Sequence, residues 1–275
     1  MNNHIVTEGT FIPVPLDQFP AIPDQPMLNP PILHDVDLEH NYPFLDKSPK
    51  ARLSNFLVYM GIFCLVFPLN ILRYGLKIKG KKNIHKNKKM FKNGAITISN
   101  HVYRWDYLAV LQAVKFRRMW FPARGLQVKG ADAKLVRGAG GIPIPETISA
   151  LKSFNQAFDE LHSKKKWIHV FPESCRWDFY QPIRPFKKGA FTFSYKYDLP
   201  IIPMVISYRK PTGLRKLINP KQPLITLTVG EPVAPAKYKD LGRKECCRLL
   251  CEECHAQMVK MAGIEQNMWQ PVSDL

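Results

Sequence analysis

The chain has 275 residues, of which 45% are hydrophobic and 23% are charged. This length suits one domain, and the composition excludes a globally disordered chain and a polytopic membrane protein. Lys and Arg number 40 against 22 Asp and Glu, a formal net charge of +18, so nucleic acid, anionic lipid headgroups, coenzyme A phosphates and acidic carrier proteins are all possible partners.

The first 50 residues differ from the rest in charge and in proline content. They hold seven acids and two bases, a net of −5, whereas the remaining residues hold 38 bases and 15 acids, a net of +23. They also contain nine of the 24 prolines. Residues 1–50 are therefore predicted to form an extended Pro-rich arm with no core of its own, although apolar residues such as Phe11 and Phe19 suit docking on the domain.

Residues 51–92 are predicted to form a membrane-associated helix followed by a basic segment. Leu53–Leu72 carries no charge, and twenty helical residues span ~30 Å, about the hydrocarbon core of a bilayer. Ser54, Asn55, Pro68 and Asn70 make it a weaker candidate than a typical span. We expect it to cross the membrane or to enter one leaflet, and the alternative is a buried helix of a soluble core.

The basic segment holds nine Lys and Arg residues between Arg73 and Lys92, and no acid occurs between Lys47 and Trp105. Such a block beside an apolar helix suits anionic headgroups, and it predicts that the following domain lies on the cytoplasmic face. A solvated basic loop is the simpler reading of the block on its own. No cleavable signal peptide opens the chain, so a reducing compartment is expected for the six cysteines.

From residue 93 to residue 275 the pattern predicts one α/β catalytic domain, a layered and mostly parallel sheet with flanking helices. Two helices are expected between the strands, at Asp106–Val114 and Ile148–His162, and a third at Arg243–Ala262. The predicted strands are Ala95–Ser99, Met119–Ala123, Gly141–Ile144, Trp167–Phe171, Ile201–Ile206 and Leu224–Val229.

The first candidate site follows the strand that ends at Ser99. Within one helix His101 and Asp106 would lie about 140° apart around the axis, so they meet only if His101 ends the strand and Asp106 begins the helix. A carboxylate that binds one ring nitrogen of a histidine fixes the tautomer and leaves the other nitrogen to take a hydroxyl proton. The spacing alone is weak evidence, because a His and an Asp in one loop are usually ordinary hydrogen-bonding residues.

The second candidate site is Phe171-Pro172-Glu173-Ser174-Cys175-Arg176, directly after the strand Trp167–Phe171. In a parallel sheet both loops emerge at the carboxyl edge, where ligand sites of α/β proteins usually form. Glu173 and Arg176 are therefore expected to approach His101 from a neighbouring strand, and a surface ion pair is the alternative for either residue.

Together the two loops resemble the glycerolipid acyltransferase family, which includes the 1-acyl-sn-glycerol-3-phosphate acyltransferases of lysophospholipid metabolism. His101 to Asp106 is similar to its His-four-residues-Asp motif, and Phe171 to Arg176 is similar to its Phe-Pro-Glu-Gly-Thr-Arg motif. Two weaker matches occur in the expected order, at residues 140–144 and at residues 200–205.

The resemblance implies an enzyme in which His101 deprotonates an acceptor hydroxyl, Asp106 orients His101, and the acceptor attacks an acyl thioester. The donor would be acyl-CoA or acyl carrier protein, and the acceptor a lysophospholipid, most simply 1-acylglycerol 3-phosphate. No cofactor, no metal and no nucleic-acid partner are expected. The residues implied in substrate binding are Glu173, Ser174, Cys175, Arg176, Gly141 and Ile142.

Departures from the family pattern bear on the acceptor. Pro145 and Glu146 stand where the second motif commonly ends in an arginine that holds the acceptor phosphate, and Ser174 replaces the usual glycine of the third motif. A glycolipid or an aminolipid therefore stays open as the acceptor. A different class, a non-catalytic basic membrane-binding protein, is disfavoured because His101 and Asp106 are retained.

Two metal hypotheses fit the sequence poorly. Metal-dependent hydrolysis needs further ligands near His101, and residues 102–105 supply none. In the tail, Cys246, Cys247, Cys251, Cys254 and His255 lie on one predicted helix, with no separated second pair to complete a tetrahedral zinc site. Small buried hydrophobic side chains are the better reading of these cysteines.

Overall fold

The computed structural model describes residues 4–29, 31–34, 36–39 and 42–273. Its centre is a seven-stranded sheet of order β2-β8-β7-β3-β6-β4-β5. All neighbouring pairs are parallel except β7 and β8, which confirms the predicted mostly parallel α/β sheet. The strands are β2 (Lys77–Lys79), β3 (Ile96–Ser99), β4 (Met119–Ala123), β5 (Gly141–Pro143), β6 (Trp167–Val170), β7 (Ile201–Arg209) and β8 (Leu224–Val229).

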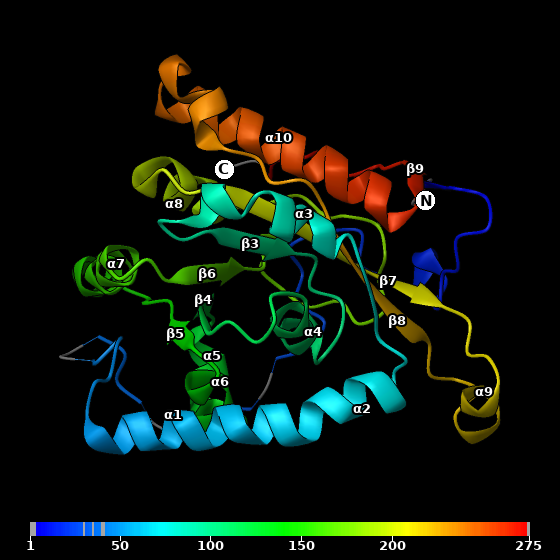
Figure 1. Cartoon of the computed structure of the whole chain (residues 1–275), viewed down its shortest axis with the longest axis horizontal. Helices are drawn as coiled ribbons and strands as arrows, with labels where there is room; N and C mark the ends of the chain where they lie inside the picture. Colours follow the sequence, from blue (N-terminus) through cyan, green and yellow to red (C-terminus); the bar gives the residue numbers. More distant parts are fainter. Residues whose placement is uncertain (1–3, 30, 35, 40–41, 274–275) are drawn as a thin grey trace.

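Helices cover both faces of the sheet (Figure 1). Apolar side chains of α7 (Ile148–Ser163), α8 (Gly189–Tyr197) and α10 (Arg243–Ala262) form one core with one face. The other core lies between the opposite face and α4 (Asp106–Ala113). Below it in Figure 1 lie α5 (Gly125–Lys129) and α6 (Ala133–Gly138). Side chains of β6 and β7 contribute to both cores, as expected for strands buried on two sides.

The predicted apolar helix forms one long rod (Figure 1). It consists of α1 (Pro49–Gly61), a π-helical turn (Ile62–Val66) and α2 (Phe67–Leu72). Ser48 caps its start by accepting a hydrogen bond from the Ala51 N–H. One side of the rod packs on the domain: Val58 lies against Gly138, where an added Cβ would come within 2.5 Å of a Val58 methyl group.

The basic segment contains structure that the sequence pattern did not indicate. Lys77–Lys79 forms the edge strand β2, which pairs with β8, and α3 (Lys81–Lys86) follows it. Lysines on an edge strand keep it from pairing with other chains. Gly80 joins the two elements at a positive φ of 72°, in contact with the Val229 carbonyl, a position that favours glycine.

The N-terminal arm docks on the domain at several points. β1 (Ile5–Val6) pairs with β9 (Ile264–Gln266) after α10, and buried Phe19 packs on the rings of Trp177 and Tyr180. The ability of the arm to dock is thus confirmed for these residues. The division of the chain at residues 50 and 92 stays a prediction.

Candidate active site

His101 and Asp106 meet at the carboxyl edge of the sheet. Asp106 is the first residue of α4, and its Oδ2 lies 2.6 Å from Nδ1 of His101, two residues beyond β3. Asp106 is buried, and its second oxygen accepts a hydrogen bond from the Tyr107 N–H at 2.7 Å. The carboxylate is therefore held, and it fixes the proton of His101 on Nδ1. No described residue provides a hydrogen-bond partner for Nε2, and the His101 side chain is 13% exposed.

The loop that carries His101 is fixed to its neighbours through the backbone and through Asn100. The Asn100 side chain accepts from the Ile206 N–H at 2.8 Å and donates to the Ile206 carbonyl at 2.9 Å, which ties the loop to β7. The Tyr208 hydroxyl donates to the Val102 carbonyl at 2.6 Å. These contacts explain why the polar Asn100 is completely buried, and they set the direction in which His101 leaves the strand.

Glu173 joins the two motif loops. Its Oε2 accepts the His101 N–H at 3.1 Å, and Oε1 accepts the Arg184 N–H at 2.9 Å. The Arg184 guanidinium donates to the same Oε2 at 3.0 Å, and both side chains are fully buried. The expectation that Glu173 approaches His101 is confirmed, whereas no such contact is seen for Arg176, and both Glu173 oxygens already have protein partners. In this structure Glu173 holds the His101 backbone in place.

Arg184 is a site residue that the sequence did not indicate. Its guanidinium also contacts the Cys175 carbonyl and the Trp177 ring, 4.4 Å from the ring centroid, and it donates to the Pro23 carbonyl of the arm at 3.0 Å. The Trp177 Nε1–H donates to the neighbouring Gln25 carbonyl at 2.8 Å. The sequence does contain one signal: Arg184 lies between the apolar residues Ile183 and Phe186, a pattern that indicates burial. A buried arginine needs a partner of opposite charge, so a nearby carboxylate could have been expected.

Arg176, the arginine that the motif indicated, does not contact Glu173. Its Nε lies 2.9 Å from Oδ1 of Asp178, and its side chain is 27% exposed. Burial raises the pKa of Asp178, and the nearby Arg176 charge opposes that shift. The pKa of Asp178 also responds to the charges of Asp106 and His101, so this ion pair lies within electrostatic reach of the catalytic candidates. Arg176 is thus available to exchange Asp178 for an anionic ligand.

The two intervening motif residues serve the loop. Ser174 is exposed at a φ of 63°, the left-handed region that glycine, the usual residue of the motif, adopts easily. Cys175 is buried, with Sγ beside Arg184. Their roles in substrate binding stay predictions.

Two aromatic side chains lie behind His101: Phe171, which begins the second motif, and His169, which the sequence did not single out. Phe171 stacks on the His101 ring with centroids 4.1 Å apart, and His169 packs edge-on against Phe171. Burial lowers the pKa of His169 to about 3, so this residue is neutral at physiological pH. Its Nδ1 lies 2.9 Å from the Thr97 hydroxyl. His101 therefore rests on an uncharged, rigid surface.

Gly141 and Ile142 lie away from His101. They belong to β5 at the edge of the sheet, and β6 and β4 separate β5 from β3, a lateral distance of roughly 14 Å at the usual strand spacing. Ile142 is fully buried. Their part in acceptor binding stays a prediction, and the structure gives them no contact with the histidine.

The tail cysteines pack as the sequence predicted. Cys246, Cys247, Cys251 and Cys254 are buried on α10, and burial raises the pKa of Cys251 to about 12. Across the described residues, no group of three His, Cys, Asp or Glu side chains is arranged to hold a metal ion.

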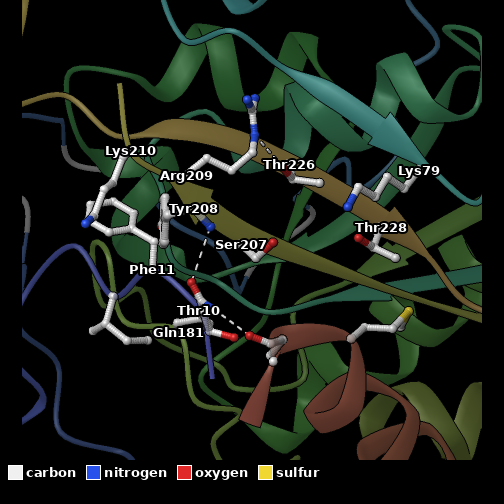
Figure 2. A pocket seen from close by; sticks show the side chains of 15 residues that line it. Thr10, Phe11, Lys79, Gln181, Ser207, Tyr208, Arg209, Lys210, Thr226 and Thr228 are labelled. Carbon is white, nitrogen blue, oxygen red and sulfur yellow. Dashed lines mark hydrogen bonds between the residues drawn. The ribbon is translucent and has the colours of Figure 1, made fainter. Parts of the chain in front are cut away.

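A large cavity is lined by residues of β2, β7 and β8 (Figure 2). It measures about 810 Å³, and Lys79, Ser207, Arg209 and Thr228 line it together with arm residues 9–12. Figure 2 shows these side chains on the ribbons of β2, β7 and β8. His101 and Asp106 are not among its lining residues, so this cavity is not the catalytic centre.

Comparisons with known proteins agree with the geometry of the two loops. Residues 75–207 match the family model described as Acyltransferase, and this range includes His101, Asp106 and Glu173. A Caenorhabditis elegans protein named "Putative 1-acyl-sn-glycerol-3-phosphate acyltransferase acl-1" is 36% identical over 61 residues, which cover 22% of this chain and 23% of that relative.

A solved structure is also similar, that of the 1-acyl-sn-glycerophosphate (LPA) acyltransferase PlsC from Thermotoga maritima. The alignment has a TM-score of 0.47 and 17% identity, and it covers 77% of this chain and 97% of the other. The match to the family model covers just under half of the chain, residues 75–207, and both motif loops lie inside it, so this part of the chain is similar to the acyltransferase family.

Proposed function

We propose that the protein transfers a fatty acyl chain from an acyl thioester to a hydroxyl group of a lysophospholipid. The observation that carries this proposal is the 2.6 Å contact between His101 Nδ1 and Asp106 Oδ2, which leaves Nε2 as the free base at the carboxyl edge of the sheet. A histidine oriented in this way needs no covalent nucleophile on the enzyme.

The proposed reaction follows from that geometry. His101 Nε2 takes the proton of the acceptor hydroxyl while the hydroxyl oxygen attacks the thioester carbonyl. The new C–O bond forms, the C–S bond breaks, and the departing thiolate receives the proton from the imidazolium, so that the base is regenerated. Asp106 stabilises the transient imidazolium, and Glu173 holds the His101 backbone during the cycle.

The acceptor is proposed to carry a phosphate, as 1-acylglycerol 3-phosphate does, and Arg176 is the residue that would bind it. Its planar guanidinium suits a phosphate, and its present partner Asp178 is a carboxyl group whose pKa is raised by burial, so this partner is held less firmly as an anion. The donor is proposed to be acyl-CoA or acyl carrier protein, both of which suit a strongly cationic surface.

The rod of α1 and α2 is proposed to place the site at a membrane surface. Pro49–Leu72 is long and apolar enough to cross a bilayer. However, Ile62 and Asn70 are buried against the domain, and the Gln112 side chain donates to the Phe67 carbonyl. If this rod crossed the bilayer, the domain packed along it would also have to enter the hydrocarbon core. We therefore infer that the rod lies in one leaflet with its outer apolar side in lipid.

A short helix extends this apolar surface. α9 (Leu214–Ile218) exposes Leu214, Leu217 and Ile218, of which Leu217 is 80% exposed. Arg215 of the same helix donates to the carbonyls of Leu72 and Ile71, each at 3.0 Å. The helix is thereby held at the end of α2 (Figure 1), and its leucines continue the lipid-facing side of the rod. This arrangement supports a domain that sits at a membrane surface, and the basic segment 73–92 is the feature that favours the cytoplasmic face.

The test of this function is an assay in membranes with labelled acyl-CoA and a panel of lysolipids. Wild-type protein is expected to label 1-acylglycerol 3-phosphate, and His101→Ala is expected to lose transfer. Equal labelling by the two proteins would contradict the mechanism and favour a non-catalytic membrane-binding protein.

Arg176→Gln separates the two kinds of acceptor. It is expected to raise KM for a phosphate-bearing acceptor by ~10-fold or more while leaving KM for the donor unchanged. If a glycolipid or aminolipid is labelled preferentially and Arg176→Gln has no effect, the acceptor lacks the phosphate.

A further inference from the structure

A second cavity, of about 410 Å³, lies between the N-terminal half of α1, α6 and the starts of β4 and β5. It is strongly cationic. The charged side chains that line it are Lys50, Arg118, Lys134, Arg137 and Asp46.

None of the four cations of this cavity forms a salt bridge within the residues that the structure describes, although the charge of Arg137 lowers the pKa of Asp46 at longer range. Arg118 lies between the rings of Tyr59 and Trp120, 5.1 and 5.2 Å from their centroids, and its buried Nε has no hydrogen-bond partner in the described chain. Arg137 donates to the Tyr42 hydroxyl and the Pro43 carbonyl, which are both neutral. A buried guanidinium N–H without an acceptor is costly, so a ligand oxygen is expected here.

The single carboxylate does not offset these charges. Asp46 accepts a hydrogen bond from the Ser48 N–H at 2.9 Å, and this bond lowers its pKa, so it stays ionised. Lys50 and Lys134 are exposed at the mouth and are free to turn towards a ligand. Four cations against one anion leave the cavity a net charge of about +3.

The cavity opens beside the surface that we assign to lipid. Ser54 and Asn55 line it from α1, which explains two polar residues in an otherwise apolar helix. Leu53, Phe56 and Leu57 of the same turns are exposed on the outer side. A phosphate held in the cavity would therefore leave its acyl chains beside the apolar side of the rod.

The cavity is also separate from the catalytic loops. Trp120 and Gly141 stand at the starts of β4 and β5, whereas His101 follows the end of β3. Because β3, β6, β4 and β5 are parallel, the starts and the ends lie at opposite edges of the sheet. A lipid bound here is not the acceptor that His101 activates.

We propose that this cavity binds the phosphate headgroup of an anionic membrane phospholipid and so anchors α1 at the bilayer. The inference rests on the proposed membrane association. Arg118, with Tyr59 and Trp120 fixing its position, would supply the inner donors, and Lys50 and Lys134 would close over the phosphate from the mouth.

The test compares two double variants of equal charge in the full-length protein. Lys50→Ser with Lys134→Ser alters the cavity, whereas Lys216→Ser with Lys221→Ser removes two exposed lysines, one on α9 and one after it, next to the proposed lipid surface but outside the cavity. Cosedimentation is measured with phosphatidylcholine vesicles and with vesicles that also contain phosphatidylglycerol. Two lysines that act only by non-specific attraction contribute ~2 kcal/mol, so the α9 variant is expected to lose the preference for anionic vesicles by about 30-fold at most, and the cavity variant by distinctly more. Equal losses would show non-specific attraction and overturn the proposal.

A soluble probe separates this proposal from the membrane proposal on which it rests. Dihexanoyl phosphatidylglycerol below its micelle concentration needs no bilayer, and calorimetry should show saturable binding to wild-type protein and at least ~10-fold weaker binding to the cavity variant. No saturable binding, or equal affinity for inorganic phosphate, would overturn the lipid site. Failure of membrane association alone would appear instead as loss of cosedimentation with all vesicles while this soluble binding persists.

Discussion

The five-residue separation of His101 and Asp106 closes into a 2.6 Å contact because a strand ends before the first residue and a helix begins at the second. Neither a strand nor a helix running through both residues would bring the side chains together. The carboxylate is buried and also accepts the Tyr107 N–H, so it can hold one tautomer of the imidazole.

Asp106→Asn is therefore expected to lower kcat by about 10²- to 10⁴-fold, because an amide no longer fixes the proton on Nδ1. The measurement is a steady-state assay with acyl-CoA and 1-acylglycerol 3-phosphate. Asp132→Asn is the matched control, since the Asp132 side chain is exposed and pairs with the exposed Arg104, so this variant should keep wild-type kcat. Full activity of Asp106→Asn would remove the orienting role from this carboxylate.

Arg184 and Arg176 are expected to differ in what they support. Arg184→Gln leaves the buried Glu173 carboxylate without its cation, and the free energy of unfolding should fall by about 3–5 kcal/mol. Arg176→Gln should change the free energy of unfolding by less than ~1 kcal/mol, because its ion pair with Asp178 is partly exposed. Urea unfolding of both variants measures the difference.

A double variant checks that the loss arises from the unpaired charge. Glu173→Gln with Arg184→Met removes both charges together, and it should be less destabilised than Arg184→Gln alone. Similar stability of Arg184→Gln and Arg176→Gln would contradict a buried ion pair between Glu173 and Arg184.

The sequence indicated the sheet and the loops that carry the candidate site, because both depend on local patterns. Trp167–Val170 and Leu224–Val229 are short apolar runs, and such runs mark buried strands wherever they pair. His101, Asp106 and Glu173 then follow from the parallel order of the strands, which places the loops at one edge. Boundaries differ by only one or two residues in most elements, and β7 continues three residues beyond the predicted end at Ile206.

The contacts that the sequence did not reveal are non-local. The partner of Glu173 is Arg184, eleven residues further along the chain, and two other Arg184 contacts are the Pro23 carbonyl and the Trp177 ring. These contacts come from segments without regular secondary structure, and the periodicity of helices and strands therefore does not predict that they surround the Arg184 guanidinium. Likewise β2 lies within a run of lysines, where pairing with β8 outweighs a poor strand propensity.

Membrane association is expected to depend on α9 as well as on α1 and α2. Leu217→Ser with Ile218→Ser removes two of the three exposed apolar side chains of α9, and partitioning into phosphatidylcholine vesicles should fall by roughly 30-fold, the equivalent of ~2 kcal/mol. Leu241→Ser is the control, because Leu241 is similarly exposed but lies before α10, far along the chain from this surface. If the control and the double variant partition alike, α9 does not contact lipid.

Two buried histidines should make the fold sensitive to acid. Burial lowers the pKa of His169 to about 3 and that of His255 to about 4, whereas an unfolded chain binds these protons near pH 6.5. Below pH 6.5 the two histidines therefore bind protons in the unfolded state but not in the folded state. The free energy of unfolding decreases as the pH falls.

The expected loss is about 1 kcal/mol per pH unit for each histidine between pH 6.5 and pH 4, with full stability above that window. Guanidinium unfolding at a series of pH values measures it. His255→Asn should reduce the slope of unfolding free energy against pH by about 1 kcal/mol per pH unit, because an amide at this position does not titrate. His85→Asn is the control, since His85 is exposed on α3 and its replacement should leave the slope unchanged. An unchanged slope in His255→Asn would mean that this histidine is not held neutral in the folded protein.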